Sequence, residues 1–192
     1  MSRRGAGRLR IIGGQWRSRV VAFDPALGVR PTPDRVRQTL FDWLAPCIDG
    51  ARCLDLFAGS GALGLEALSR GAARCTFLET GAAQAAGVDA ALRALGAQTR
   101  AEVRVADALS WLRQPQGRYD IVFLDPPYGS GLLQPALDAL APRLAPGNRV
   151  FLEWPGDAAP RLPAGFEILR EKAAGQVSYA LATFRAEAEP AT

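Results

Sequence analysis

The sequence of 192 residues contains no histidine, a single lysine, and three cysteines without a CxxC spacing. Histidine is the commonest general base and the commonest zinc ligand, so its absence excludes the usual serine and cysteine triads, and we expect no metal site. The odd number of cysteines favours buried free thiols over a disulfide framework at Cys47, Cys53 and Cys75. Any catalysis must therefore use carboxylates, amides, backbone groups or a cofactor.

Long apolar runs are also missing. The longest, such as residues 121–124, fall far short of the roughly 20 residues that a membrane span needs. The basic stretch MSRRGAGRLR at residues 1–10 is followed by no uninterrupted apolar segment, so we expect no secretory signal. The hydrophobic content of 48% is typical of one globular domain with an appendage. We therefore predict a cytoplasmic protein without a membrane-spanning segment.

Positive charge is concentrated at one end of the chain. Residues 1–37 contain nine arginines and two aspartates and have a net charge of +7. The remaining residues have a net charge of −3, which gives the total of +4. A basic segment on a mildly acidic body suggests that one end of the protein binds a polyanion. A solubilising tail in an arginine-rich proteome explains the same charge equally well, so the charge alone does not decide.

The first 48 residues are predicted to form an accessory to the main domain. Residues 1–10 are rich in glycine and arginine, and we expect them to be a disordered basic tail. Within residues 11–48, two β-prone runs around a Gly-Gly pair predict a hairpin that carries Trp16. A proline-punctuated loop then leads into a helix that Thr32 or Asp34 can cap. One face of this helix carries the apolar residues Val36, Leu40, Phe41 and Leu44.

Residues 49–186 are predicted to form an α/β domain. Short apolar runs alternate there with helix-like stretches, which is typical of a parallel sheet with crossover helices. Near the end of this domain, two β-prone runs around Ala174–Gly175 predict an antiparallel hairpin at the far edge of the sheet. Residues 187–192 are expected to be a second disordered tail. The predicted strands are residues 52–57, 74–79, 103–106, 120–124 and 149–154, and the predicted helices are residues 61–69, 82–95, 109–113 and 132–144.

The segment DLFAGSGALG joins a predicted strand to a helix through a turn at Gly59, Ser60 and Gly61. Such a turn lets the backbone pass close to a ligand, and loops of this kind bind adenosyl cofactors. Together with Gly64, the glycines also satisfy the spacing GxGxxG, so the loop alone fits a dinucleotide as well as S-adenosylmethionine. The structural alternative is that the small residues only allow the helix to pack closely on the strand. Asp55 favours S-adenosylmethionine, because a carboxylate suits the cationic amino-acid end of that cofactor and repels a pyrophosphate.

Acidic residues also follow the next two predicted strands. Glu79 is placed to bind the ribose hydroxyls of either cofactor. Asp107, with Ala108, is placed to meet an adenine amino group, although Asp107 fits equally well as the cap of the following helix. Ligands of an open parallel sheet bind beyond the carboxyl ends of its strands. We therefore expect Asp55, Glu79, Asp107 and Asp125 to converge on one crevice.

The fourth predicted strand ends in Asp125, Pro126, Pro127 and Tyr128. The prolines fix φ and lack N–H groups, so carbonyls are left free to accept hydrogen bonds. Asp125 and the Pro126 carbonyl can together accept hydrogen bonds from both N–H groups of an exocyclic amine and direct its lone pair at a methyl sulfonium. Tyr128 offers an aromatic face on which a flipped base stacks. Orientation supplies much of the rate of such a transfer, and Asp125 acts electrostatically or as a base. A strand-terminating turn is the structural alternative.

With these motifs in hand, the sequence resembles the class I, Rossmann-like methyltransferases. More narrowly, it resembles the RsmD-type bacterial enzymes that methylate the 2-amino group of a guanine in 16S ribosomal RNA. The resemblance covers nearly the whole chain, although DxFxGxG and DPPY are shared with many amino-directed DNA and RNA methyltransferases. The more specific blocks are RIIGGQWRSR at residues 10–19, RPTPDRVRQTLFDWL at residues 30–44 and REKAAGQVSY at residues 170–179.

The resemblance implies S-adenosylmethionine as cofactor, a target-amine site at residues 125–128, and 16S ribosomal RNA in a small-subunit particle or assembly intermediate as partner. The implied cofactor site comprises Asp55, Phe57, Ala58, Gly59, Ser60, Gly61, Glu79, Asp107 and Ala108. The residues expected to bind RNA are Arg10, Trp16, Arg17, Arg19, Arg35 and Arg37. Gln38 and Asp42 stand where the family is expected to have Glu and Asn, and we assign them no role.

Some alternatives stay open at this point. Trp16 suits the core at least as well as RNA binding. Arg35 and Arg37 point to different sides of the predicted helix, and we expect Arg35 to face the crevice and Arg37 to face solvent or RNA. DNA adenine methylation is the nearest competing function. A nicotinamide-dependent dehydrogenase leaves DPPY and the basic segment unexplained, and a catalytically silent RNA-binding domain leaves Asp55 and Asp125 unexplained.

Overall fold

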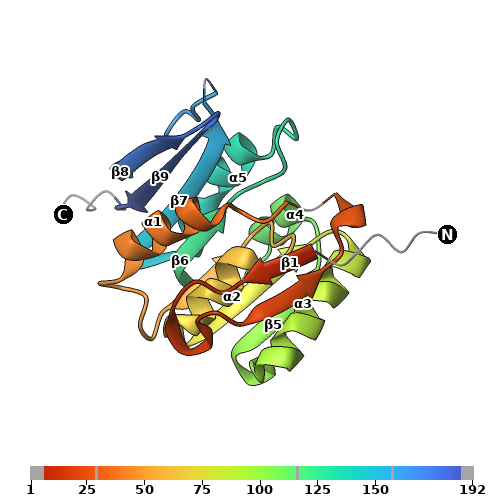
Figure 1. The fold of residues 1–192 in the computed structure, drawn as a ribbon. Coiled ribbons are helices and arrows are strands. Elements are labelled where there is room, and N and C mark those ends of the chain that lie inside the picture. Colours follow the sequence, from red (N-terminus) through yellow and green to blue (C-terminus); the bar gives the residue numbers. More distant parts are fainter. Residues whose placement is uncertain (1–6, 29, 116, 157, 187–192) are drawn as a thin grey trace.

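Seven strands form one mixed sheet at the centre of the computed structural model, which describes residues 7–28, 30–115, 117–156 and 158–186 (Figure 1). The strand order is β5-β4-β3-β6-β7-β9-β8. The first five strands in this order run parallel, whereas β9 is antiparallel to both β7 and β8. The strands are β3 (Arg52–Asp55), β4 (Arg74–Glu79), β5 (Ala101–Val105), β6 (Tyr119–Leu124), β7 (Leu144–Pro155), β8 (Phe166–Ala174) and β9 (Val177–Phe184).

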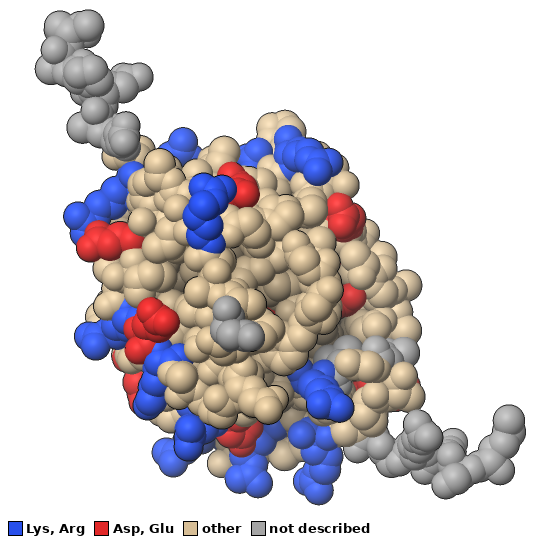
Figure 2. All heavy atoms as spheres, turned by 90° about the horizontal axis from the view of Figure 1, so that it is seen from above, with Lys and Arg blue, Asp and Glu red and all other residues tan. Residues whose placement is uncertain are grey.

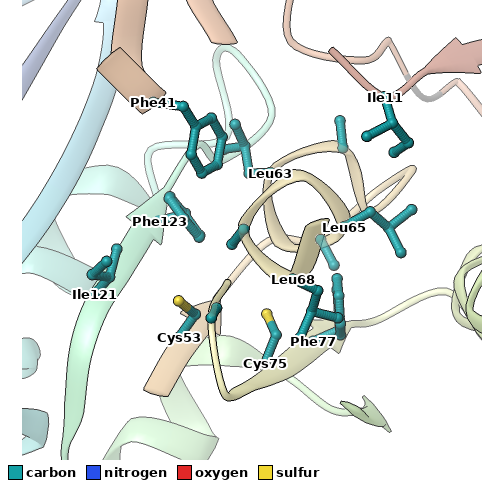
Figure 3. Packing of buried hydrophobic residues seen from close by; sticks show 14 of the residues in the cluster. Ile11, Phe41, Cys53, Leu63, Leu65, Leu68, Cys75, Phe77, Ile121 and Phe123 are labelled. Atoms are coloured by element: carbon teal, nitrogen blue, oxygen red, sulfur yellow. The ribbon is translucent and has the colours of Figure 1, made fainter. Parts of the chain in front are cut away.

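Helices cover both faces of the sheet. One face packs against α1 (Asp34–Leu44), α2 (Ala62–Ser69) and α3 (Ala82–Leu95), and the other packs against α4 (Ala108–Arg113) and α5 (Leu133–Leu140). Successive strand residues point to opposite faces, so Phe123 joins the first core and Leu124 the second. Figure 3 shows Phe41 of α1 facing Phe123, with ring centroids 6.0 Å apart. The predicted α/β, Rossmann-like fold with a C-terminal antiparallel hairpin is therefore confirmed.

The predicted elements differ from the observed ones mainly at their ends. Helix α3 has the predicted bounds, residues 82–95. Helix α5 ends at Leu140, because Pro142 lies in the short 3-10 turn η4 (Ala141–Arg143) that follows. Strand β7 begins at Leu144, five residues before the predicted start, and Leu144 pairs with Tyr119. A further 3-10 turn, η3 (Gln98–Arg100), leads into β5.

The N-terminal segment forms a second, two-stranded sheet on the helical layer of α2 and α3. Strand β1 (Gly7–Arg10) pairs antiparallel with β2 (Val20–Phe23), and the 3-10 turns η1 (Gly14–Trp16) and η2 (Pro25–Leu27) lie between and after them. The expected disorder of residues 1–10 is wrong for residues 7–10, because Leu9 is buried and its backbone is paired. Residues 1–6 and 187–192 lie outside the described residues.

The side chain of Trp16 belongs to the core. It is buried, and the guanidinium of Arg100 lies over its ring at 5.1 Å from the centroid. The structure therefore favours the core interpretation of Trp16, and its expected contact with RNA is wrong for this buried position. Cys53 and Cys75 are buried free thiols, as predicted, and Cys47 is a half-buried one.

Helix α1 buries the face that its apolar spacing predicts. Val36, Leu40, Phe41 and Leu44 are all buried. The expected side-chain cap is absent, because Pro33 occupies the N-cap position and makes no side-chain hydrogen bond. None of the helices in the described ranges combines the length and the apolar character that crossing a membrane requires.

A buried ion cluster fastens the N-terminal segment to the sheet domain. The carboxylate of Glu66, on α2, is fully buried and accepts hydrogen bonds from the backbone N–H groups of Ile12 and Gly13 at 2.9 and 2.8 Å. It also pairs with the guanidinium groups of Arg37 at 3.4 Å and Arg70 at 2.7 Å. Both carboxylate oxygens are thereby satisfied, which a buried charge requires.

Arg37 extends this cluster toward the N-terminus of α1. Its side chain is fully buried and donates to the carbonyls of Arg10 at 3.0 Å and Thr32 at 3.1 Å, and to the carboxylate of Asp34 at 2.6 Å. The expectation that Arg37 faces solvent or RNA is therefore wrong. The pair with Asp34 is local, whereas the sequence around Arg37 does not reveal its buried partner Glu66, which is 29 residues away along the chain.

The cluster makes a prediction about stability. Glu66→Gln keeps the shape of the side chain but leaves the buried guanidinium of Arg37 without its buried counter-charge, so we expect a loss of about 3–5 kcal/mol in the free energy of unfolding. Urea denaturation followed by circular dichroism measures it. The control is Asp89→Asn, which breaks the exposed pair with Arg93 and is expected to cost less than about 1 kcal/mol. Equal losses in the two variants would contradict the anchoring role of Glu66.

Candidate active site

Four acidic residues lie at one edge of the sheet. Asp55 ends β3 and Glu79 ends β4, whereas Asp125 directly follows β6 and Asp107 lies two residues beyond β5. Because β5, β4, β3 and β6 are parallel neighbours, their carboxyl ends meet at this edge. The sheet order thus brings the acidic residues together as predicted, with Asp55 and Asp125 on adjacent strands.

The glycine loop turns the chain from β3 into α2. The buried carboxylate of Asp55 accepts a hydrogen bond from the backbone N–H of Gly64 at 3.0 Å, across the turn. Gly61 has a φ of +76°, which favours glycine. A Cβ on Gly64 would lie 2.2 Å from the ring of Phe77, so this glycine lets α2 approach β4. The third glycine of the motif is therefore explained by packing.

Glu79 supports the same loop from the next strand. Its two carboxylate oxygens accept from the backbone N–H groups of Gly59 and Gly81, each at 2.9 Å. A shallow hollow beside the loop is lined by Gly59 and Ser60, by residues of α3, and by Phe23 and Asp24 of the N-terminal segment. Within the loop, Phe57 is half-buried and Ala58 is buried.

Asp107 caps α4. Its carboxylate accepts from the backbone N–H of Ser110 at 2.8 Å, and the hydrogen bonds from Ser110 lower the pKa of this exposed carboxyl. Ala108, the first residue of α4, is buried. The structure thus shows the capping role, while the contact of these two residues with adenine stays a prediction.

Asp125 is held from the opposite side by the segment that precedes α1. Its carboxylate accepts a hydrogen bond from the hydroxyl of Thr32 at 2.9 Å. Burial raises the pKa of Asp125 to about 6, and the Thr32 hydroxyl works against this rise. Pro126 is buried and Pro127 is exposed. Thr32, which the sequence suggests only as a helix cap, is therefore a support of the candidate catalytic residue.

A fifth carboxylate, missed by the sequence analysis, lies beside Asp125. Leu124 of β6 pairs with Leu152 of β7, so the next residues, Asp125 and Glu153, are neighbours across the two strands. Glu153 is 4% exposed and accepts a hydrogen bond from the hydroxyl of Tyr128. The signal was present in the sequence, since Glu153 is the one charged residue of the apolar run VFLEW.

Five arginines expected to bind RNA fall into two groups. The side chains of Arg10, Arg17, Arg19 and Arg35 are exposed. Arg19 also donates to the carbonyl of Ala94 at 2.7 Å. Arg37 is buried in the ion cluster, as described above. No group of three or more potential metal ligands comes together among the described residues.

The acidic edge fits S-adenosylmethionine. Asp55 is oriented by the backbone N–H of Gly64 in α2 and Glu79 by that of Gly59 in the glycine loop, and each carboxylate oxygen carries a second lone pair for a further donor. These acceptors suit an ammonium group and ribose hydroxyls, whereas they would repel a pyrophosphate. A parallel sheet of this order, a glycine loop after β3 and DPPY after β6 define a Rossmann-like, S-adenosylmethionine-dependent methyltransferase.

Comparisons with known proteins identify the family. The model of the family described as "Conserved hypothetical protein 95" matches residues 9–183. Ribosomal RNA small subunit methyltransferase D of Escherichia coli K12 is 46% identical over 188 residues, which cover 96% of this chain and 94% of that protein. The protein of the same name from Haemophilus influenzae is 42% identical, over 91% of this chain and 93% of that protein. This chain belongs to the ribosomal RNA small subunit methyltransferase D family.

The solved structures agree with this assignment. The structure described as a putative methyltransferase yhhF from Escherichia coli has a TM-score of 0.87 and 44% identity, and the match covers 94% of this chain and all of that one. A putative methylase from Haemophilus influenzae has a TM-score of 0.79 and 40% identity, over 92% of this chain and 98% of that one. The resemblance to RsmD-type methyltransferases is therefore confirmed, and the dehydrogenase alternative is rejected.

Burial of Asp55 predicts a specific pH dependence of stability. Burial raises its pKa in the folded protein to about 7, against about 3.9 in an unfolded chain. Between these values the folded state binds a proton that the unfolded state does not, so this contribution to stability is full below about pH 4 and is lost as the pH rises through about 7. Asp55→Asn, which carries no charge, should flatten this decline in urea unfolding measured at several pH values.

The control for this experiment is Asp49→Asn, a change at an exposed position. It should reproduce the slope of stability against pH seen in the unsubstituted protein. An Asp55→Asn variant with that same slope would show that Asp55 does not contribute to the pH dependence of stability.

Proposed function

We propose that this chain transfers a methyl group from S-adenosylmethionine to the exocyclic 2-amino group of a guanine in 16S ribosomal RNA. The observation that carries the proposal is the position of Asp125 and the Pro126 carbonyl, one strand away from the cofactor loop. The substrate follows from relatives that are named as small-subunit ribosomal RNA methyltransferases and match almost the entire chain. We further propose that the substrate is a small-subunit ribosomal particle or assembly intermediate and that the reaction takes place in the cytoplasm.

The residues of DPPY are suited to a weak nucleophile. The lone pair of an exocyclic amine is delocalised into its ring, so the amine reacts only when it is well oriented. Asp125 and the Pro126 carbonyl would accept hydrogen bonds from its two N–H groups, and the negative charge of Asp125 would stabilise the positive charge that develops on nitrogen. As the N–C bond forms, the S–C bond of the cofactor would break to leave a neutral thioether, and the methylated nitrogen would then lose one proton, to Asp125 or to water. The bound cofactor supplies a methyl group on a sulfonium. The prolines keep the acceptors rigid, since φ is fixed in both residues.

Tyr128 offers a surface for the base. Its side chain is 59% exposed, and its hydroxyl is tied to Glu153. A base that is displaced from its stack can lie against this ring, because every base has a face that stacks on an aromatic side chain. Stacking is tolerant of base identity, so Tyr128 provides binding and leaves the choice of base to the neighbouring polar groups.

The N-terminal segment supplies the positive charge for RNA. Arg10, Arg17 and Arg35 are exposed on it, and the backbone that carries them is fixed to α2 through Glu66 and Arg37. Figure 2 shows basic side chains, interspersed with acidic ones, around the margin of the face seen from above. We assign residues 11–48 the role of an RNA-binding accessory, since contacts between arginine and phosphate position a nucleic acid without reading its sequence.

Nucleoside mapping tests the proposed reaction. Small-subunit particles from a strain without the enzyme are incubated with the protein and labelled S-adenosylmethionine, and the RNA is digested to nucleosides. The label should appear in N2-methylguanosine. Asp125→Asn should lower the transfer rate by at least about 100-fold and retain binding of S-adenosylmethionine, measured by calorimetry.

The matched control is Asp120→Asn, at the opposite end of the same strand, where the carboxylate contacts Arg52. This variant should transfer methyl groups at the normal rate. Label in N6-methyladenosine would replace the proposal by an adenine-directed one, and normal activity of Asp125→Asn would refute the role of Asp125.

The salt dependence of RNA binding tests the basic segment. Each arginine that contacts a phosphate contributes about 0.7–0.9 to the slope of log K against log salt. Arg10→Gln, Arg17→Gln and Arg35→Gln should therefore each lower that slope by about this amount in filter-binding titrations. Arg74→Gln, at the amino end of β4, is the control and should leave it unchanged. Unaltered slopes in all three test variants would show that the segment does not contact phosphates.

A further inference from the structure

The Oε2 atom of Glu153 has no hydrogen-bond partner, and it is the one buried side-chain oxygen or nitrogen atom of the described residues in this condition. The other oxygen of the same carboxylate accepts from Tyr128. A buried acceptor without a donor is costly, so native structures rarely keep one without a functional reason. Nothing in the packing explains its charge, since its neighbours along β7 are apolar and its cross-strand partner is Tyr179.

The position of Glu153 links it to the target-amine site. It lies beside Asp125 across adjacent parallel strands, which are about 4.8 Å apart. Asp125 follows Leu124, and Glu153 follows Leu152; both leucines belong to the core under α4 and α5. Because successive strand residues point to opposite faces, both carboxylates lie on the face of the sheet covered by α1. Tyr128 bridges the two, because it belongs to DPPY and donates to Glu153. A base that stacks on Tyr128 would therefore lie next to the two residues that carry these carboxylates.

The Watson–Crick edge of guanine presents two neighbouring donors, the N1–H and the 2-amino group. In the proposed reaction, Asp125 and the Pro126 carbonyl accept hydrogen bonds from the amine. The N1–H then needs an acceptor of its own. We propose that Oε2 of Glu153 accepts the N1–H of the target guanine and thereby determines specificity for guanine. Adenine carries a bare ring nitrogen at N1, so two acceptors would oppose each other there. This inference rests on the proposed function.

The proposed role requires the ionised form of Glu153, since only that form is an acceptor at both oxygens. Burial and the nearby charge of Asp125 raise the pKa of Glu153 to about 7. A donor that reaches Oε2 favours the ionised form and offsets this rise. The N1–H of guanine thus satisfies an acceptor that the protein itself leaves unsatisfied.

The test replaces the target guanine by 2-aminopurine, which keeps the 2-amino group but has no hydrogen on N1. Once mapping has located the nucleotide, 16S RNA carrying either base there is made by splinted ligation and assembled into particles. The unsubstituted enzyme should methylate guanine at least about tenfold more efficiently, in kcat/KM, than 2-aminopurine, because the analogue leaves Glu153 unpaired. Equal efficiencies would overturn the inference while the proposed function stands.

Glu153→Gln provides the second arm, since its amide can donate to the bare N1 of 2-aminopurine. The preference for guanine should shrink by about tenfold or more in this variant, with binding of S-adenosylmethionine unchanged in calorimetry. Tyr128→Phe, which removes only the bond to the other oxygen of Glu153, should keep the preference. If Glu153→Gln lowered kcat/KM equally for guanine and 2-aminopurine, Glu153 would have a structural role instead. Failure of the unsubstituted enzyme to methylate guanine at all would refute the proposed function itself.

Discussion

The buried carboxylate of Glu66 is the interaction on which the rest of the structure depends. It receives two backbone N–H groups of the N-terminal segment and the guanidinium groups of Arg37 and Arg70, so it joins that segment, α1 and α2. Arg37 passes the constraint on to the Thr32 carbonyl, and the Thr32 hydroxyl reaches Asp125. One unbroken series of hydrogen bonds therefore connects the basic segment to the residue assigned to orient the amine.

The distribution of charge divides the molecule into two working parts. The edge of the sheet at the carboxyl ends of its parallel strands gathers the carboxylates of Asp55, Glu79, Asp125 and Glu153, an arrangement that repels phosphates and attracts amino and hydroxyl donors. The exposed arginines of the N-terminal segment lie outside this group of carboxylates, and the sheet domain carries further exposed arginines, several of them paired with acidic side chains. In the proposed reaction the basic segment would attract the phosphates of RNA, while the carboxylates would bind the base through its N–H groups. The net charge is only +4 because residues 38–192 carry a net charge of −3, which offsets part of the +7 of residues 1–37.

Local patterns in the sequence predict most of the fold, and long-range contacts account for what they miss. Helix α3 and the acidic strand ends follow from periodicity and from the rule that ligands bind beyond parallel strands. The roles of Arg37 and Thr32 do not, because their partners lie 29 and 93 residues away. Glu153 and Glu66 stand as lone charges within apolar segments, and that contrast is a usable sign of a buried polar site.

The insertion of β9 between β7 and β8 has a consequence for biosynthesis. Strand β7 carries Glu153 and has a strongly apolar sequence, and β9 is synthesised only after β8. Until β9 leaves the ribosome, β7 is an unprotected edge that can pair with the edge of another nascent chain. Completion of the sheet therefore has to outpace aggregation of the emerging polypeptide, and the part of the sheet that carries Glu153 is among the last parts of the molecule to form.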